Sequence, residues 1–181
     1  YTGPRNNTKE HLQVAKDHGY SDVIIPKEDD SVTVKVNLKH FEEVYLGGVV
    51  ERADVLIALT HFKGHEMTGF GGALKNLGMG LGNRKGRLAM HSDCDNCKAK
   101  NTCKKKQTIA SCWVGSPALV QEKLVEYAYG GVKSKKNKVA YINFITDVSP
   151  NCDCYDHNDE PIVPDIGILA SFDPVAIDQA C

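Results

Sequence analysis

Residues that can bind a ligand gather in one short segment, HFKGHEMTGFGGALKNLGMG, at positions 61–80. Two histidines, His61 and His65, can transfer protons or ligate a metal, and Lys75 can orient an anion. The segment directly follows the apolar run at 54–60, whose length and composition are typical of a buried strand. Ligands of open α/β sheets bind beyond the carboxyl ends of the strands. We therefore expect these three side chains to line a catalytic or binding cleft.

Glycines are concentrated in the same part of the chain. Eight of the 16 glycines lie between Gly64 and Gly86, and glycine lets backbone N–H groups come close to a ligand. We expect a glycine-rich turn that runs into a helix and binds an anion there, with Gly71, Gly72 and Asn76 as cofactor-binding positions. Tight turns and close helix packing would also explain the glycines.

Three standard motifs are absent from this segment. The run GFGGAL breaks the dinucleotide fingerprint at Leu74, and no Gly-Lys-Ser/Thr sequence forms a P-loop. His61 and His65 have the spacing of a helical zinc pair, but Lys63 and Gly64 replace the catalytic glutamate pattern. A zinc protease is therefore not indicated, and each histidine alone is also compatible with a hydrogen-bonded loop residue.

Four cysteines form a first cluster within 19 residues, at Cys94, Cys97, Cys103 and Cys112. Lysines interspersed among them favour the thiolate form. Four thiolates can hold one [4Fe–4S] cluster or one tetrahedral zinc ion, although neither standard spacing is met. Both ligands remain candidates, as do free thiols or disulfides, and Cys112 beside Trp113 could instead belong to the core.

Cys152 and Cys154 form a second cluster, which follows another apolar run. We expect the two cysteine side chains to differ in direction, so that this pair rarely binds one metal unaided. We expect Cys152 and Cys154 to form a second wall of the cleft that holds His61 and His65 and to serve as metal ligands there, and His91 to close a third side as a further metal ligand. The alternative is a polar surface loop.

Alternating helices and strands are predicted to position these residues. Thr8 is the expected N-cap and Gly19 the expected C′ residue of the first helix. Helices are predicted at 8–18, 117–131 and 173–180. Strands are predicted at 22–26, 31–37, 54–60, 138–146 and 165–171, and the segment 43–53 is predicted to be a strand that runs into a short helix. This order predicts an α/β fold with a mainly parallel or mixed sheet flanked by helices.

The expected domain organisation follows from the same pattern. Residues 1–91 and 117–181 form one α/β domain, and the lysine- and cysteine-rich region 92–116, which lacks periodicity, is a small insertion. We expect the domain to be part of a longer chain.

Composition excludes some classes of protein. The net charge of −1 gives no bias toward nucleic acid or membrane surfaces, and no apolar run approaches the roughly 20 residues of a membrane span. Seven cysteines without secretory features indicate metal ligands in a cytoplasmic protein rather than a disulfide framework.

Long segments of the chain closely resemble the domain-of-unknown-function 362 family, often labelled iron–sulfur centre proteins. They are YTGPRNN, LTHFKGHEMTGFGGALKNLGMGLGNRKGRLAMHSD, QEKLVEYAYG and INFITDVSPNCDCYDHNDEPIVPDIGILASFDPVAIDQA. Many members carry a ferredoxin-like insertion whose Cys-x2-Cys-x2-Cys-x3-Cys-Pro runs imply two [4Fe–4S] clusters. This chain has a different spacing, Cys94-x2-Cys97-x5-Cys103-x8-Cys112, without the proline or a second set. The resemblance therefore implies at most one cluster here, and it names a family rather than a reaction.

Two functions are compatible with these patterns. The first is a metal-dependent or redox enzyme domain that binds a small anionic ligand or a redox partner in the cleft and uses an iron–sulfur cluster or zinc. A looser analogy, at the level of the fold, is the nickel-dependent lactate racemase class. The second is a non-catalytic, zinc-stapled module that binds a protein through the basic insertion. Iron and sulfide in the purified protein would favour the first, and zinc alone the second.

Overall fold

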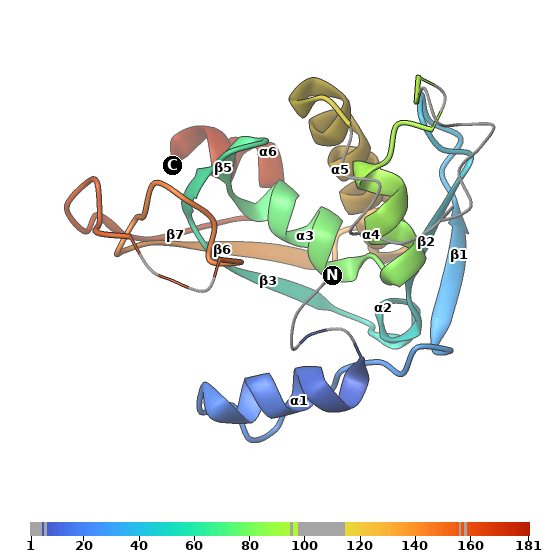
Figure 1. Cartoon of the computed structure of the whole chain (residues 1–181), viewed down its shortest axis with the longest axis horizontal. Helices are drawn as coiled ribbons and strands as arrows, with labels where there is room; N and C mark the ends of the chain where they lie inside the picture. The colour runs from blue at the N-terminus through green and yellow to red at the C-terminus, as the bar shows by residue number, and fades with distance from the viewer. Residues whose placement is uncertain (1–4, 6, 95, 98–114, 156, 158) are drawn as a thin grey trace.

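A three-stranded mixed sheet lies at the centre of the fold (Figure 1). The computed structural model describes residues 5, 7–94, 96–97, 115–155, 157 and 159–181. Strand β3 (Leu56–His61) pairs in parallel with β6 (Val139–Ile145), and β7 (Gly167–Ser171) pairs antiparallel with β6. The predicted α/β fold with a mixed sheet is confirmed. In parallel strands the carboxyl ends meet at one edge, so His61 lies opposite Phe144.

Helices cover one face of this sheet. Figure 1 shows α3 (Ala73–Leu81) and α6 (Pro174–Ala180) on that face, with α5 (Pro117–Val132) behind them. The buried core between these helices and the sheet consists of Ala58, Ala73, Leu77, Ala128, Val139, Tyr141 and Ile177.

A second core fills the space beside the sheet. It is enclosed by the antiparallel pair β1 (Ser31–Lys35) and β2 (Glu43–Gly47), by α2 (Gly48–Arg52), by α4 (Arg84–His91) and by α5. Its fully buried side chains include Val44, Leu46, Met90 and Tyr127. A short 3₁₀ helix at Lys133–Lys135 follows α5. Core and sheet together fix α3, and therefore Lys75, relative to the strand ends.

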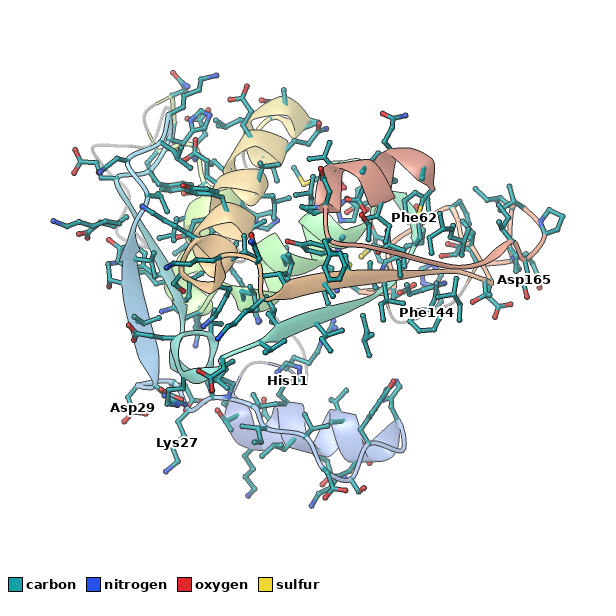
Figure 2. All side chains as sticks on the ribbon, turned by 180° about the vertical axis from the view of Figure 1, so that it is seen from behind. His11, Lys27, Asp29, Phe62, Phe144 and Asp165 are labelled. Carbon is teal, nitrogen blue, oxygen red and sulfur yellow. The ribbon has the colours of Figure 1, made fainter. Side chains whose placement is uncertain are left out.

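The opposite face of the sheet is open. Ile57, Leu59 and Ile168 are 58%, 62% and 62% exposed, and Phe144 points to the same side (Figure 2). Helix α1 (Thr8–Asp17) lies on this side in Figure 1, but it contributes no buried residue and leaves these side chains uncovered. In the part of the chain that the structure describes, no helix is long and apolar enough to span a membrane.

Several local predictions need correction. The segment 22–26 is not a strand, because it has no neighbouring strand to pair with, and the carbonyl of Pro26 binds the Thr8 hydroxyl instead. The N-cap of α1 is Asn7, whose side chain accepts from the N–H of Glu10, rather than Thr8. Gly19, with a φ of 84°, does end this helix as predicted.

The glycine-rich segment contains more structure than a turn. Strands β4 (Lys63–His65) and β5 (Gly69–Gly71) form a short antiparallel hairpin that leads into α3. Sequence reasoning missed both this hairpin and helix α4. The predicted insertion at 92–116 lies mostly outside the described residues, so its boundaries stay a prediction.

Candidate functional site

Loop 147–155 follows β6 and lies against the β4–β5 hairpin at the carboxyl end of β3. The N–H of Gly64 donates to the carbonyl of Ser149 at 2.8 Å. A side chain at Gly64 would collide with the carbonyl of Pro150, so only glycine permits this approach. The close contact brings His65 together with the two cysteines of the loop, which lie far from it in the chain.

A tight turn places Cys152 and Cys154 on the same side of the loop. The N–H of Tyr155 donates to the carbonyl of Cys152 at 3.2 Å, which closes the turn. The two thiols then hydrogen-bond to each other. The expectation that they differ in direction is therefore wrong, and an extended segment would not have separated them either, because side chains two positions apart lie on the same face of a strand.

The surroundings of Cys152 favour its thiolate form. The hydrogen bond from Cys154, a hydrogen bond from the His65 side chain and the positive charge of Lys75 together lower the pKa of Cys152 well below its ordinary value, although burial opposes them. The Lys75 Nζ lies 3.2 Å from the Cys152 Sγ. The pKa of Cys154 is raised, because it donates to Cys152, is partly buried and lies beside the thiolate. The pair thus shares one proton, which Cys154 holds.

His65 is fixed in one tautomer. Its Nδ1 accepts from the backbone N–H groups of Met67 and Thr68, at 3.1 and 3.2 Å. The proton of the neutral ring is therefore on Nε2, the nitrogen that is left to donate to Cys152. In this arrangement His65 orients and stabilises the thiolate, and it has no lone pair to offer to a metal.

His61 lies at the rim of the site, with both ring nitrogens engaged. Its Nδ1 lies 2.8 Å from a carboxylate oxygen of Asp153, and its Nε2 lies 2.8 Å from the carbonyl of Thr146. The same Asp153 oxygen binds the Nζ of Lys63 at 3.1 Å. Both ring nitrogens of His61 are thus taken up by contacts within the chain. His61 therefore anchors the cysteine loop, and its predicted catalytic role stays a prediction.

A cleft of about 370 Å³ opens beside the two cysteines. Five basic side chains and one carboxylate line it, together with Cys152 and Cys154, the amide of Asn76 and part of α3. The charged and basic residues are Arg5, His11, Lys63, Lys75, Arg87 and Asp153. This excess of positive charge beside a thiolate suits a small anionic ligand.

The glycine-rich turn binds an anion of the chain itself. The N–H groups of Ala73 and Leu74, at the start of α3, donate to the carboxylate of Asp178 at 2.6 and 3.0 Å. Gly72 is required there, because a Cβ would collide with the same carboxylate. The predicted anion site at this helix end is thus filled by Asp178, a residue that sequence reasoning missed. An acidic residue in an otherwise apolar helix face was the available signal.

Asn76 is also held by the chain. Its amide donates to the carbonyl of Leu59 and to the hydroxyl of Thr60, both at 2.9 Å, and so ties α3 to β3. That Gly71, Gly72 and Asn76 bind a cofactor stays a prediction.

The predicted metal ligands of the insertion are only partly described. Cys94 is exposed and Cys97 half-buried, whereas Cys103 and Cys112 lie outside the described residues. His91 is buried at the end of α4, where its Nδ1 lies 2.8 Å from the carbonyl of Arg87 and burial lowers its pKa. Among the residues that the structure describes, no three His, Cys, Asp or Glu side chains are placed to hold a metal ion together.

The structure thus defines a class: an α/β domain with a thiolate in a basic cleft at the carboxyl ends of two parallel strands. A family model named "Domain of unknown function (DUF362)" matches residues 1–181, and the chain belongs to that family. No protein with a curated description matches the chain.

A solved structure shares the fold. It is the lactate racemase apoprotein from Thermoanaerobacterium thermosaccharolyticum, which is 16% identical and superposes with a TM-score of 0.52. The match covers 92% of this chain and 36% of that one. The chain therefore spans about a third of the racemase, and at this identity the likeness shows the fold alone.

Proposed function

We propose that this domain is a metal-dependent enzyme domain in which Cys152 and Cys154 bind a thiophilic metal ion, or a metal-containing cofactor, beside a small anionic substrate. One observation carries the proposal: the thiolate of Cys152, held by Lys75, His65 and Cys154, forms a wall of a basic cleft. Thiolates are the ligands of soft and borderline metals. When bound, the metal would supply Lewis-acid or electron-transfer chemistry.

The side chains around the pair fit such a group. The proton that Cys154 donates to Cys152 is the one a metal would displace, since metal binding requires deprotonated ligands. Lys75 balances the thiolate charge, and Lys63 lies at the same wall, where it binds Asp153. Two sulfur ligands leave other coordination positions for a substrate or cofactor, which is typical of catalytic rather than structural sites.

Cobalt binding under anaerobic conditions tests the proposal. Co²⁺ added to the reduced protein should produce a sulfur-to-cobalt charge-transfer band, which should be lost in Cys152→Ser and strongly reduced in Cys154→Ser. Cys94→Ser and Cys97→Ser are matched controls, because they remove thiols of the predicted insertion. A band that survives Cys152→Ser but disappears in Cys94→Ser would refute the site and favour the zinc-stapled module.

A second candidate is a dithiol redox site, which the hydrogen bond between the two cysteines favours. Oxidation of the thiolate–thiol pair to a disulfide would release two electrons to an acceptor and one proton to solvent. Mass spectrometry after alkylation would separate the candidates. A Cys152–Cys154 disulfide that forms with oxidised glutathione, in protein that binds no Co²⁺, would support the redox site and contradict the metal site.

A further inference from the structure

The segment 7–30, which we call the N-terminal arm, consists of α1 and the chain that joins it to β1. In Figure 1 α1 lies at the periphery of the molecule, and Figure 2 shows His11 projecting from it toward the body of the domain. His11 lines the cleft beside Cys152 and Cys154, which we call the cysteine cleft. The arm therefore forms part of the wall of that cleft.

A second cavity lies under the arm. It has a volume of about 330 Å³ and separates the arm from the side of the domain that α2, the end of α3 and α4 form. No residue of the arm is buried, and Tyr20 and Ile24 are 65% and 81% exposed. Segments with few buried apolar contacts open at a low cost in free energy. The arm is thus expected to move away from the domain more easily than the elements of the core.

The arm is held together by contacts of its own. Near the start of α1, the N–H of Thr8 donates to the carboxylate of Glu28 at 2.7 Å, and the Thr8 hydroxyl donates to the carbonyl of Pro26 at 2.8 Å. These contacts join α1 to the chain that follows it, so the arm can move as one piece.

One end of the arm is fixed at Asp30. Both carboxylate oxygens of Asp30 accept from Arg52 of α2, at 2.7 and 2.8 Å, and its carbonyl accepts from the N–H of Gly48 at 2.9 Å. A Cβ at Gly48 would collide with the Asp30 carboxylate, so this contact requires glycine. Asp30 is therefore the point about which the arm would turn.

The other end of the arm is held at loop 147–155. The Nη2 of Arg5, just before the arm, donates to the carbonyl of Cys154 at 3.3 Å. This distance is longer than the usual range for N–H···O hydrogen bonds. A hydrogen bond from arginine to a neutral carbonyl is also weaker than hydrogen bonds between two charged groups, such as those at Asp30. The contact between Arg5 and the loop is therefore expected to break before the contacts at Asp30.

We propose that the N-terminal arm is a lid on the cysteine cleft, which turns about Asp30 and is held closed where Arg5 binds loop 147–155. Cys152 fits the closed state, because it lines the cleft and yet is only 4% exposed. Opening admits a ligand to the cleft, and closing shields the ligand from water. The lid does not depend on which metal or substrate the two cysteines bind.

Alkylation of Cys152 tests the lid. If iodoacetamide reaches Cys152 when the lid is open, Arg5→Gln should raise the alkylation rate by about two- to tenfold, the change expected from the loss of one hydrogen bond. The lost positive charge would by itself slow the reaction, because it disfavours the thiolate. Arg5→Lys should react at nearly the wild-type rate, since the lysine ammonium can donate to the same carbonyl. Peptide mass spectrometry measures each rate.

Lys9→Gln is the matched control. Lys9 is exposed on α1 and lines neither cavity, and its replacement removes the same charge. This substitution should leave the alkylation rate unchanged. An Arg5→Gln protein that reacts no faster than the Lys9→Gln protein would overturn the lid.

Backbone hydrogen exchange measures lid opening without the thiols. Helix α1 has ten residues, and a helix of this length is marginal when it does not pack on a domain. The amides of α1 should therefore exchange while the lid is open, and Arg5→Gln should speed their exchange by about the same factor as the alkylation of Cys152. The amides of β6, in the centre of the sheet, should exchange at the wild-type rate.

Two results of the exchange experiment would overturn the lid. Faster exchange in β6 would show that Arg5→Gln destabilises the whole domain rather than the arm. Different factors for α1 and Cys152 would show that the arm and the cleft do not open together.

Discussion

The pKa values of Cys152 and Cys154 are shifted in opposite directions, because the Cys154 thiol donates a hydrogen bond to the sulfur of Cys152. Cys154 keeps its proton and donates it in a hydrogen bond to Cys152, while Lys75 and His65 also stabilise the negative sulfur. Nucleophilic and metal-binding reactivity belongs to the thiolate. The reactive atom of the proposed site is therefore the Sγ of Cys152, and we propose Lys75 and His65 as positioning residues.

The alkylation rate of Cys152 should report this asymmetry. A lowered pKa keeps the thiolate populated as pH falls through the ordinary thiol range, so the rate with iodoacetamide should change less than about threefold between about pH 8 and pH 6. An ordinary free thiol, such as that of glutathione, slows by about tenfold for each pH unit below its pKa. Peptide mass spectrometry measures the alkylation of Cys152.

Lys75→Met should raise the pKa of Cys152, because it removes a positive charge 3.2 Å from the sulfur. Because the charge of Lys75 acts beside the stronger hydrogen bonds from Cys154 and His65, the pH profile of the alkylation rate of Cys152 should move up by about one pH unit, whereas Lys9→Met should leave it unchanged. A Lys75→Met protein with the wild-type rate profile would show that Lys75 does not stabilise the thiolate.

Helix α3 positions much of the site, and contacts on several of its sides hold it in place. Asp178 from α6 binds the N–H groups at its start, and the side chain of Asn76 binds β3. On the opposite side α3 packs closely on α5, where a Cβ at Gly78 would lie 2.5 Å from the carbonyl of Leu124. Lys75 reaches Cys152 because these contacts leave the helix little freedom.

Two glycines of α3 should respond in opposite ways to alanine. Gly78→Ala forces α3 away from α5 and should lower the free energy of unfolding by about 1–3 kcal/mol. At Gly80 an added Cβ would have its nearest neighbouring atom 3.9 Å away, so Gly80→Ala should be neutral or raise the free energy of unfolding by about 0.5–1 kcal/mol. Urea denaturation of both proteins measures the difference. Equal effects would mean that α3 and α5 do not pack as described.

At the scale of the whole molecule, the sheet separates a packed side from an open side. Buried Ala58 and Tyr141 face the helices, whereas Ile57, Leu59 and Ile168 are exposed on the other face. The alternation along each strand produces this sidedness, since successive side chains point to opposite faces. The cysteine cleft lies at the end of the sheet, where loop 147–155, the β4–β5 hairpin and α3 meet.

Substitutions on the packed and on the open face of the sheet should therefore lower the free energy of unfolding by different amounts. Leu59→Thr should change the free energy of unfolding by less than about 0.5 kcal/mol, because the side chain is already exposed to solvent. Leu77 of α3 is buried in the core between the helices and the sheet. Leu77→Ala should therefore lower the free energy of unfolding by about 2–5 kcal/mol. Urea denaturation of the protein measures both. A cost above about 2 kcal/mol for Leu59→Thr would show that this face is buried.

The sequence by itself determined the fold class and the neighbourhood of the site. Apolar runs of strand length, capped amphipathic helices and polar residues after two strands are local patterns, and the structure bears out the mixed α/β sheet that they predict. The same patterns placed His65, Lys75 and the Cys152–Cys154 loop at strand ends, because parallel strands align their carboxyl ends.

Only the tertiary structure decided how these groups are used. The acidity of Cys152 depends on a turn that aligns two thiols, on a lysine 77 positions earlier in the chain and on the tautomer of His65, and none of these follows from local pattern. The N–H groups that follow the glycine turn bind Asp178, and the segment 22–26 has no strand to pair with. Local patterns could not predict either outcome, because both depend on segments distant in sequence. Periodicity reports which face of an element is apolar. The contacts between elements decide which charged or hydrogen-bonding groups lie next to that face.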